Sequence, residues 1–392
     1  MNNDKKPWGI LNGIRPAKIA AKLLLDGKSD EEVISYFVNE CGTTEKKAAL
    51  VLETAKCELP VRNSMYEDGI SLYIGIPFCP SRCLYCSFVT CGTRQATKLI
   101  PEYVECLKKE IKSAGELVFK NNRRIETVYI GGGTPTTLSA EQFHQLLCQV
   151  EESFDLKGCK EFTVEAGRPD TVTEEKLITL KKHNVGRISI NPQSMNKETL
   201  NIIGRAHSPD DIRNAMKIAR ECGFDNINMD VIAGLPGESL EMFRYTLEEV
   251  EKLSPENTTV HTMSIKRSSR LHEYLEDYAL TSGEEVEKMV DFAYEYMKAC
   301  DKQPYYLYRQ KNQLGNLENV GYCKKGYENL YNIYIMEEFQ TILSLGCGGV
   351  TKTVDRRLDK IERIFNVKEP QDYIVRLEEM IDRKKNMFDG II

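Results

Sequence analysis

Three closely spaced cysteines are the residues of this chain best suited to chemistry. Cys79, Cys83 and Cys86 stand in the stretch IPFCPSRCLYCSF, separated by three and then two residues. On one loop, three such thiolates can reach three corners of a single [4Fe–4S] cube. Because these clusters usually take four cysteine ligands, one iron would lack a protein ligand. An open metal position is where a catalytic site binds substrate, so the spacing predicts chemistry at that iron.

Two other uses of these thiols stay open. Zinc sites usually present C-x2-C pairs or cysteine with histidine, and no histidine lies within fifty residues downstream. Cys91 could instead supply a fourth thiolate and make a plain iron–sulfur electron carrier. The spacing, with the aromatic Tyr85 before the last cysteine, resembles the signature of radical S-adenosylmethionine (SAM) enzymes. In those enzymes SAM occupies the fourth iron, and one-electron cleavage yields methionine and a 5′-deoxyadenosyl radical.

A strand–helix repeat begins just before the cysteines and predicts a parallel sheet. The expected strands share short β-branched or apolar runs: Ser71–Gly75, Thr127–Ile130, Glu161–Glu165, Arg187–Asn191, Asn226–Ile232 and Thr258–Ser264. The expected helices between them share an apolar stripe: Pro101–Ala114, Ala140–Phe154, Glu174–His183, Pro209–Cys222 and Ser239–Leu253. Six such units suit an α/β fold, a partial (β/α)6 barrel whose chemistry lies at the C-terminal ends of its strands.

The flanking regions differ from this repeat. Residues 1–68 predict a helical N-terminal segment, with helices over Arg15–Leu25, Asp30–Asn39 and Thr44–Cys57. A further helix is expected at Glu284–Cys300, and Pro370 suits the first turn of a final helix. We therefore expect three domains: 1–68, a barrel at 69–275, and a mixed α/β C-terminal domain at 276–392 that faces the substrate.

Unusual residues follow each predicted strand. Gly131-Gly132-Gly133-Thr134 would let backbone N–H groups approach a ligand closely. Glu165 closes an apolar strand, where a carboxylate is costly without a partner such as a ribose diol. The fourth strand ends in Asn191-Pro192-Gln193 and is followed by Arg205, and the fifth strand holds Asp230. Each residue alone is more often structural, but together at successive strand ends they indicate one site.

Six motifs in order resemble the oxygen-independent coproporphyrinogen III oxidase (dehydrogenase) family of radical SAM enzymes: IPFCPSRCLYCSF, GGGTPT, VEAGRPD, PQSM, IGRAH and MDVIAGLPGES. The segments WGILNGIRP and PYYLYRQKNQLGNLENVGY are similar to its HemZ-type branch, whose members are usually longer at the N-terminus. The resemblance implies a cluster on the three cysteines and at least one SAM. The SAM contacts that it implies are Tyr73, Tyr85, Gly132, Gly133, Thr134, Glu165, Gln193, Arg205 and Asp230. A second SAM, which family members can hold, would lie near Ser264 and Val350.

The same resemblance implies a tetrapyrrole substrate. Hydrogen abstraction from a propionate β-carbon, with loss of CO2 and one electron, would give each of the two vinyl groups of protoporphyrinogen IX in anaerobic haem biosynthesis. The propionates need cations, for which Lys266, Arg267, Arg309 and Lys311 are the candidates, although charged loops are often only solvated surface. A flavodoxin or ferredoxin is the expected electron donor.

One position departs from the established oxidases. They carry a fourth cysteine two residues after the third ligand, whereas this chain has Phe88, as the haem-chaperone branch does. A haem-binding chaperone or a haem-modifying radical SAM enzyme therefore stays open as an alternative function.

Composition bounds the remaining classes. The 392 residues are 41% hydrophobic and 29% charged, as expected of an ordinary globular protein. A net charge of −6 gives no general attraction to nucleic acid. The N-terminus lacks the apolar core of a signal peptide, and no apolar run reaches the length of a membrane span. Thirteen scattered cysteines suit reduced thiols in a cytoplasm.

Overall fold

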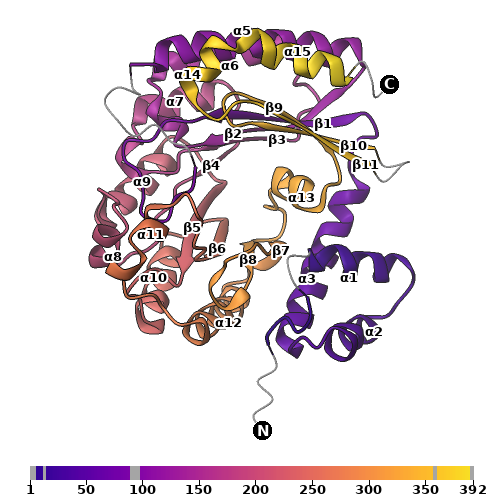
Figure 1. Cartoon of the computed structure of the whole chain (residues 1–392), viewed down its shortest axis with the longest axis vertical. Coiled ribbons are helices and arrows are strands. Elements are labelled where there is room, and N and C mark those ends of the chain that lie inside the picture. The colour runs from indigo at the N-terminus through magenta and orange to yellow at the C-terminus, as the bar shows by residue number, and fades with distance from the viewer. Residues whose placement is uncertain (1–5, 12–14, 89–97, 356–359, 389–392) are drawn as a thin grey trace.

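A single open sheet of eleven strands forms the centre of the molecule (Figure 1). The computed structural model describes residues 6–11, 15–88, 98–355 and 360–388. The strand order is β11-β10-β9-β1-β2-β3-β4-β5-β6-β8-β7. The sheet curves into a partial barrel without closing, with helices on its outer face (Figure 1).

The six parallel strands β1 to β6 confirm the predicted repeat. They are β1 (Gly69–Ile76), β2 (Arg124–Gly132), β3 (Glu161–Glu165), β4 (Arg187–Ser189), β5 (Ile227–Ala233) and β6 (Asn257–Thr262). The crossover helices are α5 (Ile100–Lys120), α6 (Ala140–Ser153), α7 (Glu174–Lys182), α8 (Lys197–Ile202), α9 (Pro209–Glu221) and α10 (Leu240–Lys252). Capping residues set several boundaries: Ser139 and Ser208 each form a capping box with the third helical residue.

Five further strands extend the sheet at both edges. β7 (Gln303–Tyr308) and β8 (Asn319–Cys323) lie antiparallel beside β6. On the other edge, β9 (Thr341–Leu345) pairs in parallel with β1, and β10 (Val350–Asp355) and β11 (Lys360–Phe365) follow as a hairpin. The sheet therefore crosses the predicted boundary at residue 275, and the division into three domains stays a prediction.

The N-terminal helices lie beneath the barrel, where α3 packs against β7 (Figure 1). They are α1 (Pro16–Leu25), α2 (Asp30–Ser35), which continues as the π-helical turn η1 (Tyr36–Glu40), and α3 (Glu45–Asn63). Trp8 Nε1 donates to Glu318 Oε2 at 2.7 Å, and Lys47 Nζ bonds Glu318 Oε1 at 2.5 Å. These buried contacts hold the N-terminal segment against the loop before β8.

The remaining helices cover the outer face and the interior of the sheet. α12 (Gly283–Ala299) precedes β7, and α13 (Leu330–Glu337) lies inside the curve of the sheet (Figure 1). α14 (Pro370–Val375), which begins at the predicted proline, and α15 (Leu377–Phe388) pack on α5. The short turns are α11 (Arg270–Glu273), η2 (Pro135–Thr137), η3 (Pro169–Thr171), η4 (Leu275–Asp277) and η5 (Leu314–Asn316).

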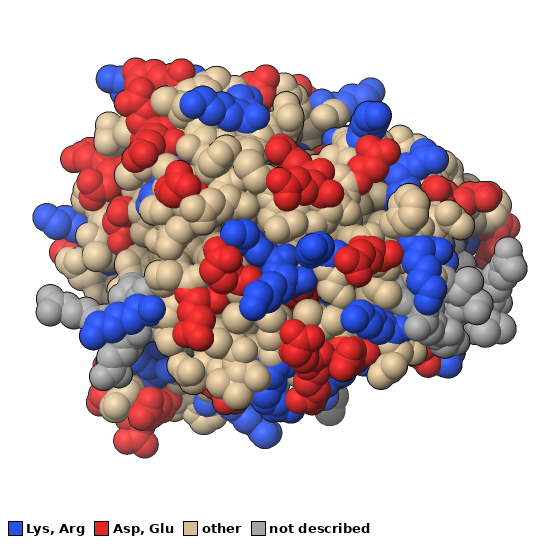
Figure 2. All heavy atoms as spheres, turned by 90° about the horizontal axis from the view of Figure 1, so that it is seen from above, with Lys and Arg blue, Asp and Glu red and all other residues tan. Residues whose placement is uncertain are grey.

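The outer surface carries both signs of charge. Figure 2 shows lysine and arginine interspersed with aspartate and glutamate over the face that includes α5 and α15. Within the described part of the chain, no helix combines the length and the apolar character that a membrane crossing requires.

Candidate active site

The cysteine loop leaves the C-terminal end of β1 and is fixed by backbone hydrogen bonds to its neighbours. Gly133 N donates to Ile76 O at 2.8 Å, and Thr134 N donates to Phe78 O at 2.7 Å. At the far side of the loop, Leu84 N donates to Ile203 O at 3.0 Å and its carbonyl accepts from Leu271 N at 2.9 Å. The end of β2 and the helical turns that follow β4 and β6 thus hold the loop that carries the three thiols.

The three cysteines form no disulfide and suit an iron–sulfur cluster. Cys83 is buried, whereas Cys79 and Cys86 are partly buried. Burial raises the pKa of Cys79 to about 11 despite a contact with the Thr134 hydroxyl at 3.2 Å, and it raises that of Cys86 as well. Neutral thiols of this kind become ligands as metal binding displaces their protons. Iron–sulfur clusters are bound by cysteine thiolates, so the three cysteines provide the ligand type that such a cluster needs.

The glycine run after β2 lies against this loop with no space for side chains. A Cβ on Gly133 would lie 2.6 Å from Phe78 O, and one on Gly131 would lie 2.8 Å from the Tyr129 ring. Gly132 has φ +113, a backbone conformation that other residues rarely adopt. The run therefore leaves the half-buried backbone of Gly132 and Gly133 beside the cysteines, the kind of surface that a small zwitterion can approach.

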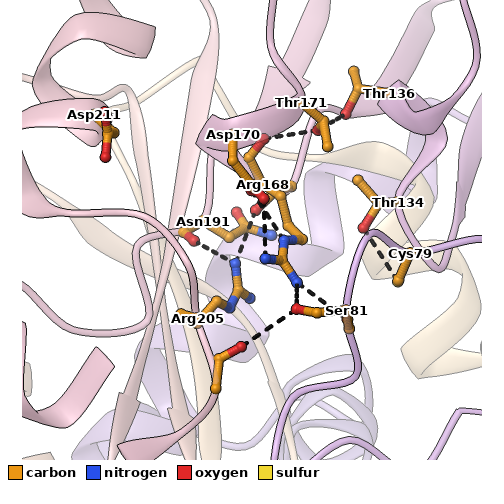
Figure 3. Close-up of polar contacts among 12 residues, drawn as sticks. Cys79, Ser81, Thr134, Thr136, Arg168, Asp170, Thr171, Asn191, Arg205 and Asp211 are labelled. Carbon is orange, nitrogen blue, oxygen red and sulfur yellow. Dashed lines mark hydrogen bonds and ion pairs between the residues drawn. The ribbon is translucent and has the colours of Figure 1, made fainter. Parts of the chain in front are cut away.

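Arg168 is a site residue that sequence reasoning missed. Its Nε and Nη2 donate to the two carboxylate oxygens of Asp170 at 3.0 and 3.1 Å, and its Nη1 donates to Ser81 Oγ at 2.8 Å (Figure 3). The side chain is 3% exposed. The Arg168 guanidinium therefore connects the segment after β3 to the cysteine loop. In the sequence, the position of Arg168 in the motif GRPD was the only signal of this role.

Arg205 reaches the same loop from the segment after β4. Its Nη2 donates to the Tyr85 hydroxyl at 3.1 Å. Its Nη1 donates to Asn191 O at 3.2 Å (Figure 3). Its buried Nε has no partner among the described residues. His207 is also buried, and burial together with Arg205 lowers its pKa to about 4. Both predicted residues, Tyr85 and Arg205, are therefore brought together.

Two carboxylates with different protonation lie inside the barrel. Burial raises the pKa of Glu165 to about 7, although Tyr129 OH donates to its Oε1 at 2.6 Å. Burial acts in the same direction on Asp230, but its partners His261 and Asn228 outweigh it and keep the pKa low. At neutral pH, Asp230 is ionised and Glu165 is divided between its two forms.

A cavity of about 370 Å³ lies where β1, β2 and the loop after β9 meet. Its lining joins predicted site residues to others: Tyr73, Ile76, Pro77, Ser87, Phe88, Gly132, Gly133, Ser268, Cys347, Gly348 and Lys368. Tyr73 stacks on Tyr129 and Tyr331, with ring centroids 6.2 Å away in both cases. The loop of residues 346–349, in the motif LGCGGV, thus belongs to the site wall through Cys347 and Gly348, whereas only Val350 of this motif was predicted as a contact.

The predicted substrate cations separate into two groups. The segment holding Lys266 and Arg267 runs beside that holding Lys311, and Lys266 bonds Gln310. Arg309 points elsewhere: it lies over the Trp8 ring and donates to Leu11 O at 2.6 Å and Asn316 O at 2.8 Å. Burial lowers its pKa to about 10. The donors of Arg309 therefore hold the N-terminal segment, and its contact with substrate stays a prediction.

The other predicted contacts are dispersed. Gln193 continues the pairing of β4 with β5 through its backbone at φ +66. Ser264 Oγ lies 3.4 Å from Lys311 O, whereas Val350 begins β10 on the opposite flank of the sheet. Among the described residues, neither of these two lines the 370 Å³ cavity. Cys91, the candidate fourth ligand, lies outside the described residues.

The sequence pattern of the radical SAM superfamily matches residues 73–250, the span of β1 to α10. In fold, the chain is similar to the coproporphyrinogen III oxidase HemN from Escherichia coli, with a TM-score of 0.63 and 22% identity over 83% of this chain and 73% of that one. The fold and the cysteine loop thus define a radical SAM enzyme.

Two curated relatives narrow the class. The chain is 44% identical over 387 residues to the oxygen-independent coproporphyrinogen-III oxidase-like protein HemZ of Bacillus subtilis. This match covers 98% of this chain and 77% of that protein. It is also 33% identical to the haem chaperone HemW of Lactococcus lactis over 202 residues. This match covers 52% of this chain and 51% of that protein. The chain belongs to the HemZ-type family of oxygen-independent coproporphyrinogen-III oxidase-like proteins.

Proposed function

We propose that this enzyme oxidatively decarboxylates propionates of coproporphyrinogen III to vinyl groups, using a [4Fe–4S] cluster on Cys79, Cys83 and Cys86 and at least one SAM. Each propionate loses one hydrogen atom by abstraction at its β-carbon, then CO2 and one electron, which a one-electron acceptor must take up. The cluster with SAM bound supplies the one-electron cleavage that starts this chemistry. A cytoplasmic flavodoxin or ferredoxin would supply electrons.

The protein's own residues bind, orient and shield. The half-buried backbone of Gly132 and Gly133 lines the cavity beside the cysteine loop, where it would receive the amino and carboxylate groups of SAM. Glu165 suits a ribose diol, because its carboxyl both donates and accepts near neutral pH. The buried guanidinium of Arg205 keeps one free N–H for a carboxylate or a sulfur.

The observation that carries the proposal is the cavity that joins the glycine run to Phe88 and Lys368 at the cysteine loop. Its wall is apolar and aromatic, and Lys368 is exposed at its edge. A tetrapyrrole rim with carboxylates requires both features. Lys266, Arg267 and Lys311 would receive the remaining propionates from the opposite side.

Product analysis tests this proposal. The anaerobically reconstituted chain is incubated with dithionite, SAM and coproporphyrinogen III, and the products are separated by mass spectrometry. Protoporphyrinogen IX with 5′-deoxyadenosine is expected, and neither should form with Cys83→Ala. Cys222→Ala, a thiol at the end of α9, is the matched control that should keep both. SAM cleavage by Cys83→Ala would disprove the cluster assignment.

A haem chaperone is the second candidate, because Phe88 occupies the position of the fourth cysteine and is 64% exposed beside the cavity. The same assay separates the two functions. Stable haem binding with no decarboxylated porphyrin would favour the chaperone, whether or not deoxyadenosine forms.

A further inference from the structure

Two histidines and a cysteine meet on the outer helices, away from the cysteine loop. His144 and Cys148 are one turn apart on α6, and His183 caps the C-terminus of α7. One donor atom from each of the three lies within 4.8 Å of the others. His144 Nδ1 is 2.9 Å from His183 Nε2, and Cys148 Sγ is 3.7 Å from His144 Nδ1.

These distances are close to those of a tetrahedral metal site. Zinc binds nitrogen at about 2.0–2.1 Å and sulfur at about 2.3 Å, so tetrahedral ligands lie about 3.3 Å apart for two nitrogens and about 3.6 Å for nitrogen and sulfur. The observed separations of 2.9 and 3.7 Å differ from these by less than half an ångström. Small rotations of His144, which is exposed, would open the histidine pair to an ion.

Glu151 completes the arrangement from behind. Its Oε1 lies 3.0 Å from His183 Nδ1. A carboxylate on this nitrogen fixes its proton there and turns the Nε2 lone pair toward the other two ligands, as in carboxylate–histidine–metal triads. Glu151 lies three residues after Cys148 on α6, so the two share one face of the helix.

The surroundings favour a cation. Glu141, Glu151 and Glu152 lie on the same helix as His144 and Cys148, so α6 carries negative charge around the three candidate ligands. That charge attracts a divalent ion, which displaces the thiol proton as it binds. His183 and Glu151 also line a cavity of about 850 Å³ at the N-terminal ends of β3 and β4. A water molecule therefore has room to serve as fourth ligand.

We propose that His144, Cys148 and His183 form a second metal site, suited to Zn²⁺ and separate from the cluster. Two imidazoles and one thiolate are the ligand types that zinc prefers, and three protein ligands leave one position for water. The bound ion would connect α6 to the end of α7, on the outside of the barrel.

Zinc retention tests the site in the full chain. The cluster-loaded protein is incubated anaerobically with one equivalent of ZnCl2, passed through a desalting column, and its zinc and iron contents are measured by mass spectrometry. Wild type should retain about one zinc beyond its cluster iron. His144→Ala and Cys148→Ala should lose it while iron is unchanged, and Cys222→Ala should retain it. Glu151→Gln should weaken zinc binding by about 10–100-fold.

Cobalt provides a second readout that does not depend on cluster loading. In the full chain carrying Cys79→Ala, Cys83→Ala and Cys86→Ala, Co²⁺ should give the intense visible bands of a tetrahedral site. Adding Cys148→Ala should abolish them. The proposal is overturned if wild type retains no zinc, if zinc retention is equal in wild type and Cys148→Ala, or if the cobalt spectrum is unaffected by that substitution.

Discussion

The carboxylate of Glu110 on α5 connects the C-terminal helices to the wall of the active site. It is 1% exposed, and four donors surround it: Lys384 Nζ at 2.7 Å, Asn366 Nδ2 at 2.9 Å, Gly346 N at 2.7 Å and Tyr373 OH at 2.6 Å. Gly346 belongs to the loop between β9 and β10. The next two residues of that loop, Cys347 and Gly348, line the 370 Å³ cavity. Glu110→Ala removes every one of these contacts and leaves the buried ammonium of Lys384 with Asn366 Oδ1 but without a charged partner.

Removal of one member of a buried ion pair costs about 3–5 kcal/mol, because the remaining charge is desolvated and uncompensated. For a chain of 392 residues, this loss corresponds to a fall in Tm of about 4–6 °C. The double variant Glu110→Ala/Lys384→Met removes the stranded charge, so we expect it to recover a large part of the lost stability. Glu105→Ala, an exposed carboxylate on the same helix, should change stability by less than about 1 kcal/mol.

Thermal and urea unfolding of the four proteins, followed by circular dichroism, measures these differences. SAM affinity, measured by equilibrium dialysis, should fall with Glu110→Ala, because the Gly346 loop loses its anchor. The reasoning is refuted if Glu110→Ala unfolds within 1 °C of wild type, or if the double variant is no more stable than the single one.

Three further outcomes are expected. Burial raises the pKa of Glu337 from 4.5 to about 7, so its ionisation destabilises the fold as pH rises through that range. Urea unfolding should therefore show Glu337→Gln to be more stable than wild type by up to about 3 kcal/mol at pH 8. At pH 4.5 the two proteins should be nearly equal in stability. Arg168→Lys cannot bond Asp170 and the cysteine loop at the same time, so it should reduce the iron bound on reconstitution. Arg213→Lys, at the exposed ion pair with Asp210, should leave the iron content unchanged. Full iron content in both variants would contradict the positioning role of Arg168. Arg309→Ala should shift Trp8 fluorescence to longer wavelength with KM for the porphyrinogen unchanged, whereas a raised KM without that shift would return Arg309 to the substrate side.

The six parallel strands could be predicted because each is a short apolar run that ends at a polar or glycine-rich motif. The strand over Glu161–Glu165 was predicted with its observed bounds. Predicted and observed strand ends elsewhere differ by up to three residues, because hydrogen bonding continues beyond the apolar run in β2, to Gly132, and stops before its end in β4, at Ser189.

The added strands and several site residues could not be predicted, because nothing local encodes their partners. TILSL at 341–345 is apolar, but its pairing with β1 depends on residues about 270 positions earlier. Arg309 lies in a tyrosine-rich segment with Lys311, and composition does not show that one side chain turns inward to Trp8 while the other is exposed. Arg168 was recognisable only as part of the GRPD motif. The sequence does not show that its guanidinium bonds both Asp170 and Ser81.

The pairing of β1 with β9 also determines when the molecule can finish folding. During synthesis, β1 and the three cysteines leave the ribosome early, but the strand that covers one edge of β1 follows only after most of the chain. Until then, β1 presents an unpaired apolar edge, which invites pairing with other chains. Contacts so distant in sequence also form slowly. Premature termination anywhere before residue 341 would therefore leave the cysteine loop on an incomplete sheet, exposed to oxidation and aggregation.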